Sequence, residues 1–257
     1  MKYDPSCFQP SYLSFGALSS SSFILHPSPF ILHPMTRSPD HPMQFTRSSD
    51  AFVLPRLYAI IDPAQIGGRA PVEVTEALLA AGVQLIQLRD KHASSGELYE
   101  RAQRVGECVR RAGGKFIVND RADVARAVDA DGVHVGQDDL PVESARALVG
   151  SGKLIGFSTH GLEQVREADR STADYVAFGP IFPTASKENP DRVVGLAGLG
   201  EARKATRKPL VAIGGINLEN ARAVIEAGAD SVAVIRALVG ARDITQSARD
   251  FLDQMSG

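Results

Sequence analysis

The feature that most constrains this chain is a regular alternation that begins at Leu57 and continues almost to the end. Short apolar runs rich in Val, Ile and Leu alternate with segments whose apolar residues recur at helical spacing, an order typical of β–α–β units around a parallel sheet. The predicted strands are Leu57–Ile61, Gln84–Leu88, Lys115–Val118, Gly132–Val135, Leu154–Phe157, Tyr175–Phe178, Leu210–Ile213 and Ser231–Ile235. The predicted helices lie at about 71–81, 95–112, 121–129, 142–149, 161–169, 196–206, 217–227 and 241–254, with Asn217 as a capping residue.

The number of strand–helix pairs decides between two α/β architectures. Eight pairs are what an eight-stranded barrel needs, and the residues from Pro55 to Gly257 just reach the lower limit of about 200 residues for that fold. An open, doubly wound sheet is the alternative, but the pairs continue evenly to eight and no Gly-x-Gly-x-x-Gly turn follows the first strand. We therefore predict an α/β chain with a (β/α)8 TIM barrel over residues 51–257.

Residues 1–50 have a different composition from the rest of the chain. They contain 11 Ser and 7 of the 15 Pro, but only Gly16 of the 23 glycines, and they show neither a helical nor an alternating apolar period. Such a segment cannot bury enough apolar surface to form a core. We predict a disordered Ser/Pro-rich tail.

Charge and cysteine content narrow the range of partners and compartments. The net charge of −2 and the pI near 6.3 give no basic surface for nucleic acid or for an anionic membrane. No uninterrupted apolar run approaches the roughly 18 residues of a spanning helix. Cys7 and Cys108 are too far apart for a disulfide framework or a zinc site, so we expect a reducing compartment, the cytoplasm, with Cys108 packed on a helix face.

Polar residues follow one predicted strand after another. In a parallel barrel the carboxyl ends of the strands meet at one rim, and active sites lie there. A single polar cluster is typical of a solvated loop, but a repeated one predicts a functional rim. The clusters are Gln87 with Arg89 to Lys91, Asn119 with Asp120, Gln137 to Asp139, Ser158 to His160, Thr184 with Ser186 and Lys187, and Gly214 with Gly215.

Charge separates these residues into a set that suits an anion and a set that suits a metal. Three cations, Arg89, Lys91 and Lys187, and three hydroxyl residues, Ser158, Thr184 and Ser186, suit a phosphate or pyrophosphate. Asp120 and Asp139 would repel such an anion unless Mg²⁺ lay between them and the phosphate oxygens. The alternative is that each Asp caps the helix that follows it.

A second anion site is predicted farther along the rim. Gly214-Gly215 and Ile235-Arg236 follow the last two strands, where phosphate-binding barrels present backbone N–H groups and a helix N-terminus. A tight turn would explain the glycine pair equally well. Two anion sites around one cavity imply two phosphorylated substrates, or one with phosphates at both ends. His134 lies within an apolar strand and is interpreted as a core or barrel-lining residue.

The order of these motifs resembles the thiamine phosphate synthase family. The runs are QLRDK, ND, GVHVGQDD, GFSTH, FGPIFPTASK, AIGGI and AVIRA, and the resemblance extends over residues 57–257. It implies a transferase of thiamine biosynthesis that condenses hydroxymethylpyrimidine pyrophosphate with hydroxyethyl-thiazole phosphate and releases pyrophosphate. It assigns the pyrimidine and pyrophosphate to Gln87, Arg89, Lys91, Asn119, Ser158 and Lys187, Mg²⁺ to Asp120 and Asp139, and the thiazole phosphate to Thr184, Ser186, Gly215, Ile235 and Arg236.

Two positions depart from the family pattern. Ser186 replaces a usual Thr and keeps its hydroxyl, whereas Arg236 stands where a small hydroxyl residue is usual. Two other functions remain as alternatives. A thiazole tautomerase shares the scaffold but lacks much of the pyrophosphate and metal set that is retained here, and a noncatalytic sensor of phosphorylated ligands would bind without turnover. The sequence leaves a homo-oligomer open.

Overall fold

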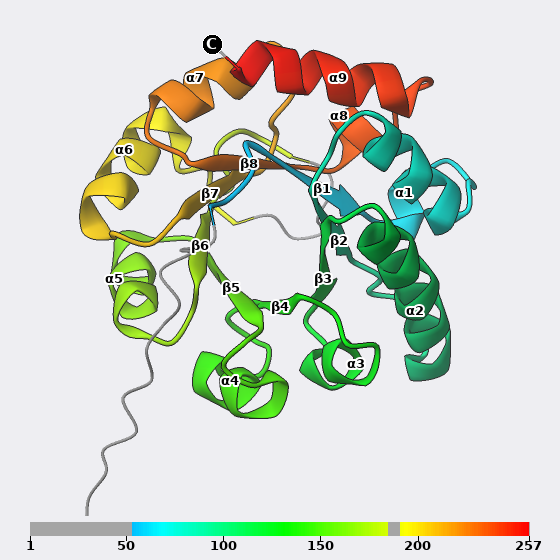
Figure 1. Cartoon of the computed structure of the whole chain (residues 1–257). Helices are drawn as coiled ribbons and strands as arrows, with labels where there is room; N and C mark the ends of the chain where they lie inside the picture. The colour runs from blue at the N-terminus through cyan, green and yellow to red at the C-terminus, as the bar shows by residue number, and fades with distance from the viewer. Residues whose placement is uncertain (1–52, 185–190, 257) are drawn as a thin grey trace, which may run out of the picture. The chain divides into compact units, whose positions relative to one another are not determined.

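A computed structural model describes residues 53–184 and 191–256 of the chain, and in this part the predicted barrel is confirmed. Each strand pairs in parallel with the next, and β1 pairs with β8, so that the sheet closes (Figure 1). The strands are β1 (Leu57–Ile61), β2 (Leu85–Leu88), β3 (Lys115–Asn119), β4 (Gly132–Val135), β5 (Leu154–Thr159), β6 (Tyr175–Phe178), β7 (Leu210–Ile213) and β8 (Ser231–Val234).

The helices surround the barrel and return the chain from the carboxyl ends of the strands to their amino ends (Figure 1). They are α1 (Pro71–Ala80), α2 (Ser95–Arg111), α3 (Ala122–Ala127), α4 (Val142–Val149), α5 (Leu162–Arg170), α6 (Gly195–Ala205), α7 (Ala221–Glu226), α8 (Arg236–Val239) and α9 (Ile244–Met255), with a 3₁₀ turn, η1, at Pro63–Gln65. Cys108 is a buried free thiol on α2, so its predicted packing role is confirmed.

Two predicted helices have the wrong boundaries. The helix expected at 217–227 begins only at Ala221, because Asn217 and Asn220 bond each other's backbone N–H groups through their side chains and hold a turn there. The helix expected at 241–254 is preceded by α8, and α9 begins after Asp243, whose carboxylate accepts from Gln246 N at 2.9 Å and caps it.

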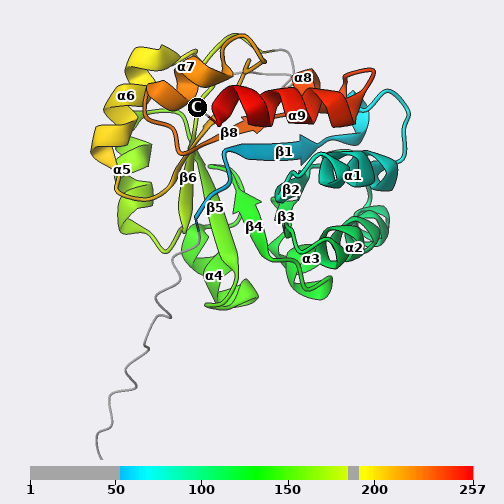
Figure 2. The ribbon, with the colours of Figure 1, turned by 45° about the horizontal axis from the view of Figure 1, so that its top comes forward.

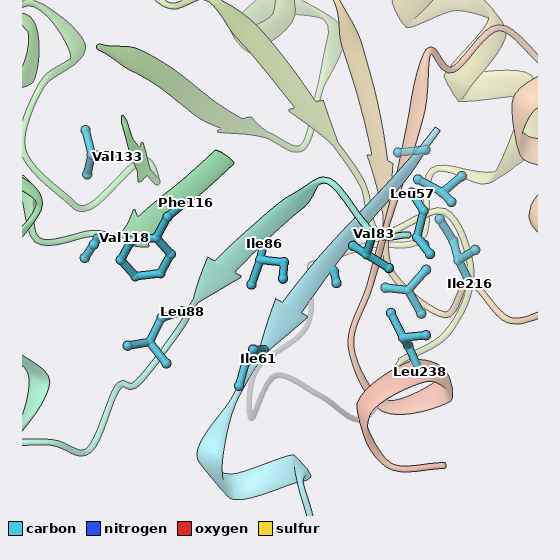
Figure 3. Packing of buried hydrophobic residues seen from close by; sticks show 14 of the residues in the cluster. Leu57, Ile61, Val83, Ile86, Leu88, Phe116, Val118, Val133, Ile216 and Leu238 are labelled. Carbon is cyan, nitrogen blue, oxygen red and sulfur yellow. The ribbon is translucent and has the colours of Figure 1, made fainter. Parts of the chain in front are cut away.

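The strands alternate between two apolar layers, as the period of two predicts. Outward residues pack beneath the helices, and Figure 3 shows members of that layer such as Ile61, Ile86 and Phe116. The inward residues form a smaller core inside the barrel: Leu54, Tyr58, Ile60, Leu85, Ile117, Tyr175, Ala177, Val211 and Ala233. The polar side chains Gln87 and His134 lie among the inward positions and are buried. The barrel interior is therefore polar on one side, beneath the site described below.

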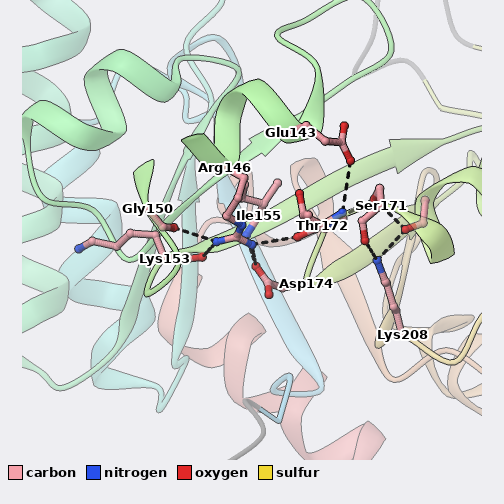
Figure 4. A network of polar contacts seen from close by, with 11 residues as sticks. Glu143, Arg146, Gly150, Lys153, Ile155, Ser171, Thr172, Asp174 and Lys208 are labelled. Carbon is pink, nitrogen blue, oxygen red and sulfur yellow. Dashed lines mark hydrogen bonds and ion pairs between the residues drawn. The ribbon is translucent and has the colours of Figure 1, made fainter. Parts of the chain in front are cut away.

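The amino ends of the strands are joined by an ionic network. Asp174 precedes β6, and its Oδ2 accepts from Ile155 N of β5 at 2.7 Å while Arg146 of α4 contacts the same oxygen (Figure 4). Arg146 also donates to the carbonyl of Thr172 at 3.0 Å. Asp174 N in turn donates to Ile155 O at 2.7 Å, so side chain and backbone together extend the β5–β6 pairing.

Both ends of the described chain lie at the amino ends of the strands, opposite the rim. Val53 and Leu54 lead directly into β1, and α9 runs beside α1, where Arg249 Nη2 donates to Ala80 O at the end of α1 (Figures 1 and 2). Within residues 53–184 and 191–256, no helix is both long enough and apolar enough to cross a membrane.

Candidate functional site

A cavity of about 1020 Å³ opens at the carboxyl ends of the strands. All of the predicted site residues that the structure describes line it: Gln87, Arg89, Lys91, Asn119, Asp120, Asp139, Ser158, Thr184, Gly215, Ile235 and Arg236. Ser186 and Lys187 lie outside the described residues. Because neighbours in the chain are neighbours in the barrel, the charged residues that follow β2 to β4 lie on one side of the cavity and the glycines that follow β7 lie on the other.

Arg89 is held by a carboxylate that the sequence analysis did not single out. Asp62, directly after β1, contacts Arg89 Nη1 through Oδ2 and accepts from Ala64 N through Oδ1 at 3.0 Å. Asp62 is 5% exposed, so this ion pair is shielded from water on its Asp side. The guanidinium is thereby fixed at the edge of the cavity.

Lys91, Asp120 and Asp139 form a second charged group. Lys91 Nζ contacts Asp120 Oδ2, and Asp120 adopts a φ of 60° as its N donates to His134 O at 2.7 Å. Asp139 Oδ2 accepts from Gly136 N at 2.7 Å. Burial and the nearby Asp139 carboxyl raise the pKa of Asp120 well above its ordinary value, although Lys91 opposes the shift. The charge of Asp139 therefore disfavours the ionised form of Asp120.

The alternative that these two Asp residues cap helices is wrong. The N-cap residues of α3 and α4 are Arg121 and Pro141, and neither helix has a side-chain cap hydrogen bond. Asp120 and Asp139 are instead directed to the cavity edge and to a tight turn. Both residues line the cavity.

The chemistry of this pair fits a hard divalent cation. A divalent cation bound by both carboxylates would relieve the repulsion between them. The described residues contain no group of three His, Cys, Asp or Glu side chains that could enclose a metal. Phosphate and water oxygens would therefore have to complete the coordination of Mg²⁺, which commonly retains such ligands.

Five polar side chains from β1, β2 and β4 to β6 are linked by hydrogen bonds at the base of the cavity. Gln87 Nε2 donates to Tyr58 OH at 2.7 Å, and Tyr58 OH lies 2.9 Å from Tyr175 OH. Tyr175 OH lies 3.2 Å from His134 Nδ1, and His134 Nε2 lies 2.8 Å from Ser158 Oγ. Burial lowers the pKa of His134 to about 4 and raises the pKa values of both tyrosines. His134 is therefore a hydrogen-bonded barrel-lining residue, as predicted, and it is neutral near pH 7.

The opposite side of the cavity is mostly backbone. Gly214 and Gly215 have φ values of 99° and 65°, and a Cβ on Gly215 would lie 2.5 Å from Pro183 O. The glycine pair is thus required both for the turn after β7 and for close packing against the loop after β6. Arg236 is exposed and begins α8, whose first N–H groups lack intrahelical partners.

His160 connects β5 to the loop after β6. Its Nδ1 lies 2.7 Å from Gly179 O, and since a carbonyl only accepts, Nδ1 carries a proton. Its Nε2 lies 3.5 Å from Asp191 Oδ2, and its backbone N donates to Gln164 Oε1 at 2.7 Å. All three side chains line the cavity.

The comparison with protein families gives one match, to the thiamine monophosphate synthase family, over residues 57–238. The chain belongs to this family. A thiamine-phosphate synthase from Chloroflexus aurantiacus is 49% identical over 194 residues, covering 76% of this chain and 89% of the relative. One from Koribacter versatilis is 50% identical over 204 residues, covering 77% and 95%.

A solved structure agrees with this membership in the thiamine monophosphate synthase family. Thiamine phosphate pyrophosphorylase from Pyrococcus furiosus is 38% identical, with a TM-score of 0.71, and the match covers 79% of this chain and 97% of that chain. The similarity spans the whole barrel and so includes both sides of the cavity.

The residues that sequence reasoning missed differ in how they could have been found. Asp62 follows a strand directly, so the rule that found the other rim residues would have found it if applied to β1. Tyr58 and Tyr175 lie inside apolar strands, and nothing in the local pattern separates them from core residues. Only the barrel's closure brings their hydroxyl groups together.

Proposed function

We propose that the chain joins hydroxymethylpyrimidine pyrophosphate to hydroxyethyl-thiazole phosphate, giving thiamine phosphate and pyrophosphate. The observation that carries the proposal is one cavity with basic side chains and paired carboxyl groups on one side and glycine backbone with the start of α8 on the other. Family membership and the names of the relatives support it. At about 1020 Å³, the cavity has room for two substrates side by side.

The reaction requires the departure of a leaving group. The bond between the pyrimidine methylene carbon and the pyrophosphate oxygen breaks, and its electron pair leaves with pyrophosphate. The lone pair of the thiazole nitrogen forms the new carbon–nitrogen bond, and that nitrogen becomes positively charged. The step balances without a proton transfer and needs no protein nucleophile. The protein can accelerate it by stabilising charge and by holding the two rings in contact, with water excluded.

In this proposal the cationic side of the cavity stabilises the departing pyrophosphate. Arg89 and Lys91 line the cavity and are already oriented by Asp62 and Asp120. Cations that need no reorientation stabilise the charge that develops in the transition state more than the charge of the bound substrate. The resemblance assigns the same role to Lys187. Gln87, Asn119 and Ser158 would hold the pyrimidine and the pyrophosphate.

Asp120 and Asp139 would hold Mg²⁺ together with pyrophosphate oxygens. When bound, the ion neutralises negative charge on the pyrophosphate. On the other side of the cavity, the backbone at Gly215, Ile235 and Arg236 and the hydroxyls of Thr184 and Ser186 would take the thiazole phosphate. Dipoles of N–H groups at a helix start favour such an anion.

The direct test is to mix the purified full chain with both substrates, with and without Mg²⁺, and to measure thiamine phosphate. We expect turnover that requires both substrates and the metal. Binding of both ligands without condensation would overturn the proposal in favour of a sensor. Isomerisation of the thiazole phosphate alone would indicate a tautomerase.

Replacement of Asp139 tests the metal site. We expect Asp139→Asn to raise the Mg²⁺ concentration needed for half-maximal turnover and to lower the maximal rate by about tenfold to a hundredfold, because charge on the leaving group is left uncompensated. Asp253→Asn, at an exposed position of α9, is the control for loss of one carboxylate. If Asp139→Asn keeps the parent rate and metal requirement, the assignment is wrong.

A cytoplasmic location and the separation of the chain at residue 50 into a tail and a barrel are also part of the proposal. The low cysteine content supports the first and the composition change supports the second.

A further inference from the structure

The hydrogen-bonded side chains Gln87, Tyr58, Tyr175, His134 and Ser158 form one unbranched series, which we call the inner relay. Its two ends, Gln87 and Ser158, line the cavity, as do Tyr58 and His134, whereas Tyr175 does not. Its four successive distances are 2.7, 2.9, 3.2 and 2.8 Å, all within hydrogen-bond range. The relay therefore runs along the base of the cavity and connects two of its polar groups, Gln87 and Ser158.

The packing around the relay leaves its middle members little freedom. Tyr58 and Tyr175 are each 1% exposed, and their rings meet edge to face with centroids 6.0 Å apart. A Cβ on Gly156 would lie 2.2 Å from Tyr175 Cζ and 2.3 Å from His134 Nδ1. Glycine at this position of β5 is what allows tyrosine and histidine to meet.

The hydrogen bond from Gln87 allows all the hydroxyl and imidazole protons of the series to point in one direction, towards Ser158. Each tyrosine hydroxyl has one proton, and a neutral imidazole has one N–H. Because Gln87 Nε2 donates to Tyr58, the Tyr58 proton is free to go to Tyr175 and the Tyr175 proton to His134 Nδ1. In this direction His134 would carry its proton on Nε2 and donate to Ser158 Oγ, 2.8 Å away. The Ser158 hydroxyl proton is not used within the relay.

We propose that Tyr58, Tyr175 and His134 are positioning residues that fix this direction, so that Ser158 presents its hydroxyl proton to an oxygen of the pyrophosphate. This inference rests on the proposed function only for the identity of the anion. In the opposite direction, Ser158 would donate to His134 Nε2 and turn only lone pairs towards a negatively charged ligand. That arrangement would repel the anion rather than bind it.

The direction of the hydrogen bonds also links ligand binding at Gln87 to ligand binding at Ser158. With Nε2 on Tyr58, Gln87 has its amide oxygen left, and no hydrogen bond to that oxygen occurs within residues 53–184 and 191–256. It can accept from an N–H donor on a heteroaromatic ring. A ligand donor at Gln87 and an anion at Ser158 favour the same direction, so we expect binding at one end to strengthen binding at the other.

The proton position can be observed directly. In the full chain labelled with ¹⁵N-histidine, the imidazole shifts of His134, assigned by comparison with His134→Asn, should show Nε2 protonated and Nδ1 unprotonated. Tyr175→Phe removes the donor to Nδ1, so we expect a mixture of the two tautomers. A parent spectrum with the proton on Nδ1 would overturn the inference whether or not the protein turns over.

Kinetics test whether Tyr175 acts through Ser158. We expect Tyr175→Phe to lower kcat about tenfold with a smaller change in KM, and Ser158→Ala to lower it about tenfold to a hundredfold. In the Ser158→Ala background, we expect Tyr175→Phe to lower kcat less than threefold, because the Ser158 hydroxyl proton that Tyr175 positions is no longer present. Equal costs in both backgrounds would mean that Tyr175 has only a structural role, and would overturn the proposal.

Two further variants keep the test decisive. Tyr99→Phe, at an exposed tyrosine of α2, removes a hydroxyl outside the relay and should change neither the tautomer nor kcat. If Tyr175→Phe does not fold, Tyr58→Phe serves in its place and should give a smaller shift of the same kind. Binding of inorganic pyrophosphate with Mg²⁺, measured by calorimetry, should weaken in the relay variants. If pyrophosphate binds the relay variants as tightly as it binds the parent, the proposed role of the relay is wrong. If the parent does not turn over at all, the proposed function is wrong.

Discussion

Asp62 links the start of the chain's first loop to the reactive side of the cavity. One of its oxygens fixes the backbone at Ala64, and the other holds Arg89 across the β1–β2 pair. A buried carboxylate paired in this way restrains a long side chain that would otherwise sample many rotamers. The orientation of the Arg89 guanidinium at the cavity is therefore set by Asp62.

Replacing Asp62 with Asn should expose this dependence. Asn keeps the size and the bond from Ala64 N but removes the charge that orients Arg89, so we expect kcat to fall about tenfold with a smaller change in stability. The matched control is Asp90→Asn, which removes the charge from the Asp90–Arg101 pair outside the cavity lining. Steady-state kinetics and thermal unfolding of both variants make the comparison. A larger rate loss in the control would contradict the prediction.

Arg236 is the larger of the two departures from the family pattern that the resemblance indicates. Every residue except proline supplies a backbone N–H at this position, so we expect the proposed phosphate site not to depend on a small side chain here. We expect Arg236→Ser to weaken binding of the thiazole phosphate about threefold to tenfold and to make it less sensitive to salt, since an exposed guanidinium contributes a screened attraction. Binding measured by calorimetry at low and high salt tests this.

Two other results at Arg236 would have different meanings. Unchanged binding in Arg236→Ser would show that the guanidinium stays in solvent when the ligand binds. Much faster turnover than the parent would indicate that this chain is adapted to another phosphorylated ligand.

The sequence predicts the position of a polar residue that directly follows a strand. It does not predict contacts between residues that meet only when the barrel closes. Arg89, Lys91 and Asp120 were found because polar residues after apolar runs meet at the rim. Tyr58 and Tyr175 are 117 positions apart, and their hydroxyl contact exists only because β1 and β6 face each other across the barrel. No local pattern carries that information.

At the scale of elements, one kind of Asp contact recurs in three pairs of neighbouring strands, β3–β4, β5–β6 and β7–β8. An Asp just before β4, β6 or β8 accepts through Oδ2 from a backbone N–H of the preceding strand and donates its own N–H to the carbonyl of that same residue. The pairs are Asp131 with Phe116, Asp174 with Ile155, and Asp230 with Leu210, and the three carboxylates contact Lys115, Arg146 and Arg203 respectively. These contacts lie at the amino ends of the strands, away from the cavity.

This position predicts a separation of stability from activity. Asp174→Asn leaves Arg146 without its anion and weakens the bond from Ile155 N, so we expect a loss of about 1–3 kcal/mol in the free energy of unfolding and an unchanged kcat. Asp253→Asn, at an exposed site on α9, is the control. Denaturant unfolding and initial rates on the same preparations give both quantities. A fall in kcat without a loss of stability would contradict the prediction.

Element types were predictable, and the ends of two elements were not. Every strand was identified as a short apolar run followed by a segment with helical spacing, which is the order of a parallel β–α–β sheet. The start of α7 was misplaced because the reciprocal Asn217–Asn220 bonds make a turn that competes with helix formation. The short helix α8 is a single turn and is too brief to produce a periodic signal.

At the scale of the whole molecule, activity should reside in the barrel alone. Deletion of residues 1–50 should leave folding and turnover within about twofold of the full chain, because their composition cannot contribute a packed core. Circular dichroism, thermal unfolding and the condensation assay on both proteins test this. A truncated protein that does not fold, or that loses most of its turnover, would show that the segment has a structural or catalytic role.

The overall architecture was the most predictable level of all. Eight evenly spaced strand–helix units predict a closed barrel. The closed barrel fixes the order of residues around the rim, so the residues on each side of the cavity are predictable from the sequence. The buried polar side chains at the base of the cavity are not predictable in this way, because the residues of a strand that point inward are known only once its neighbouring strands are known.

The placement of both described ends at the amino ends of the strands has a practical meaning. Val53 and Ser256 lie on the side away from the cavity mouth, and α9 reaches its end beside the last turn of α1. A resin, an electrode or a second enzyme attached behind the end of α9 would leave the entrance to the cavity open. In a layer of molecules attached at this end, every cavity would therefore face the surrounding solution.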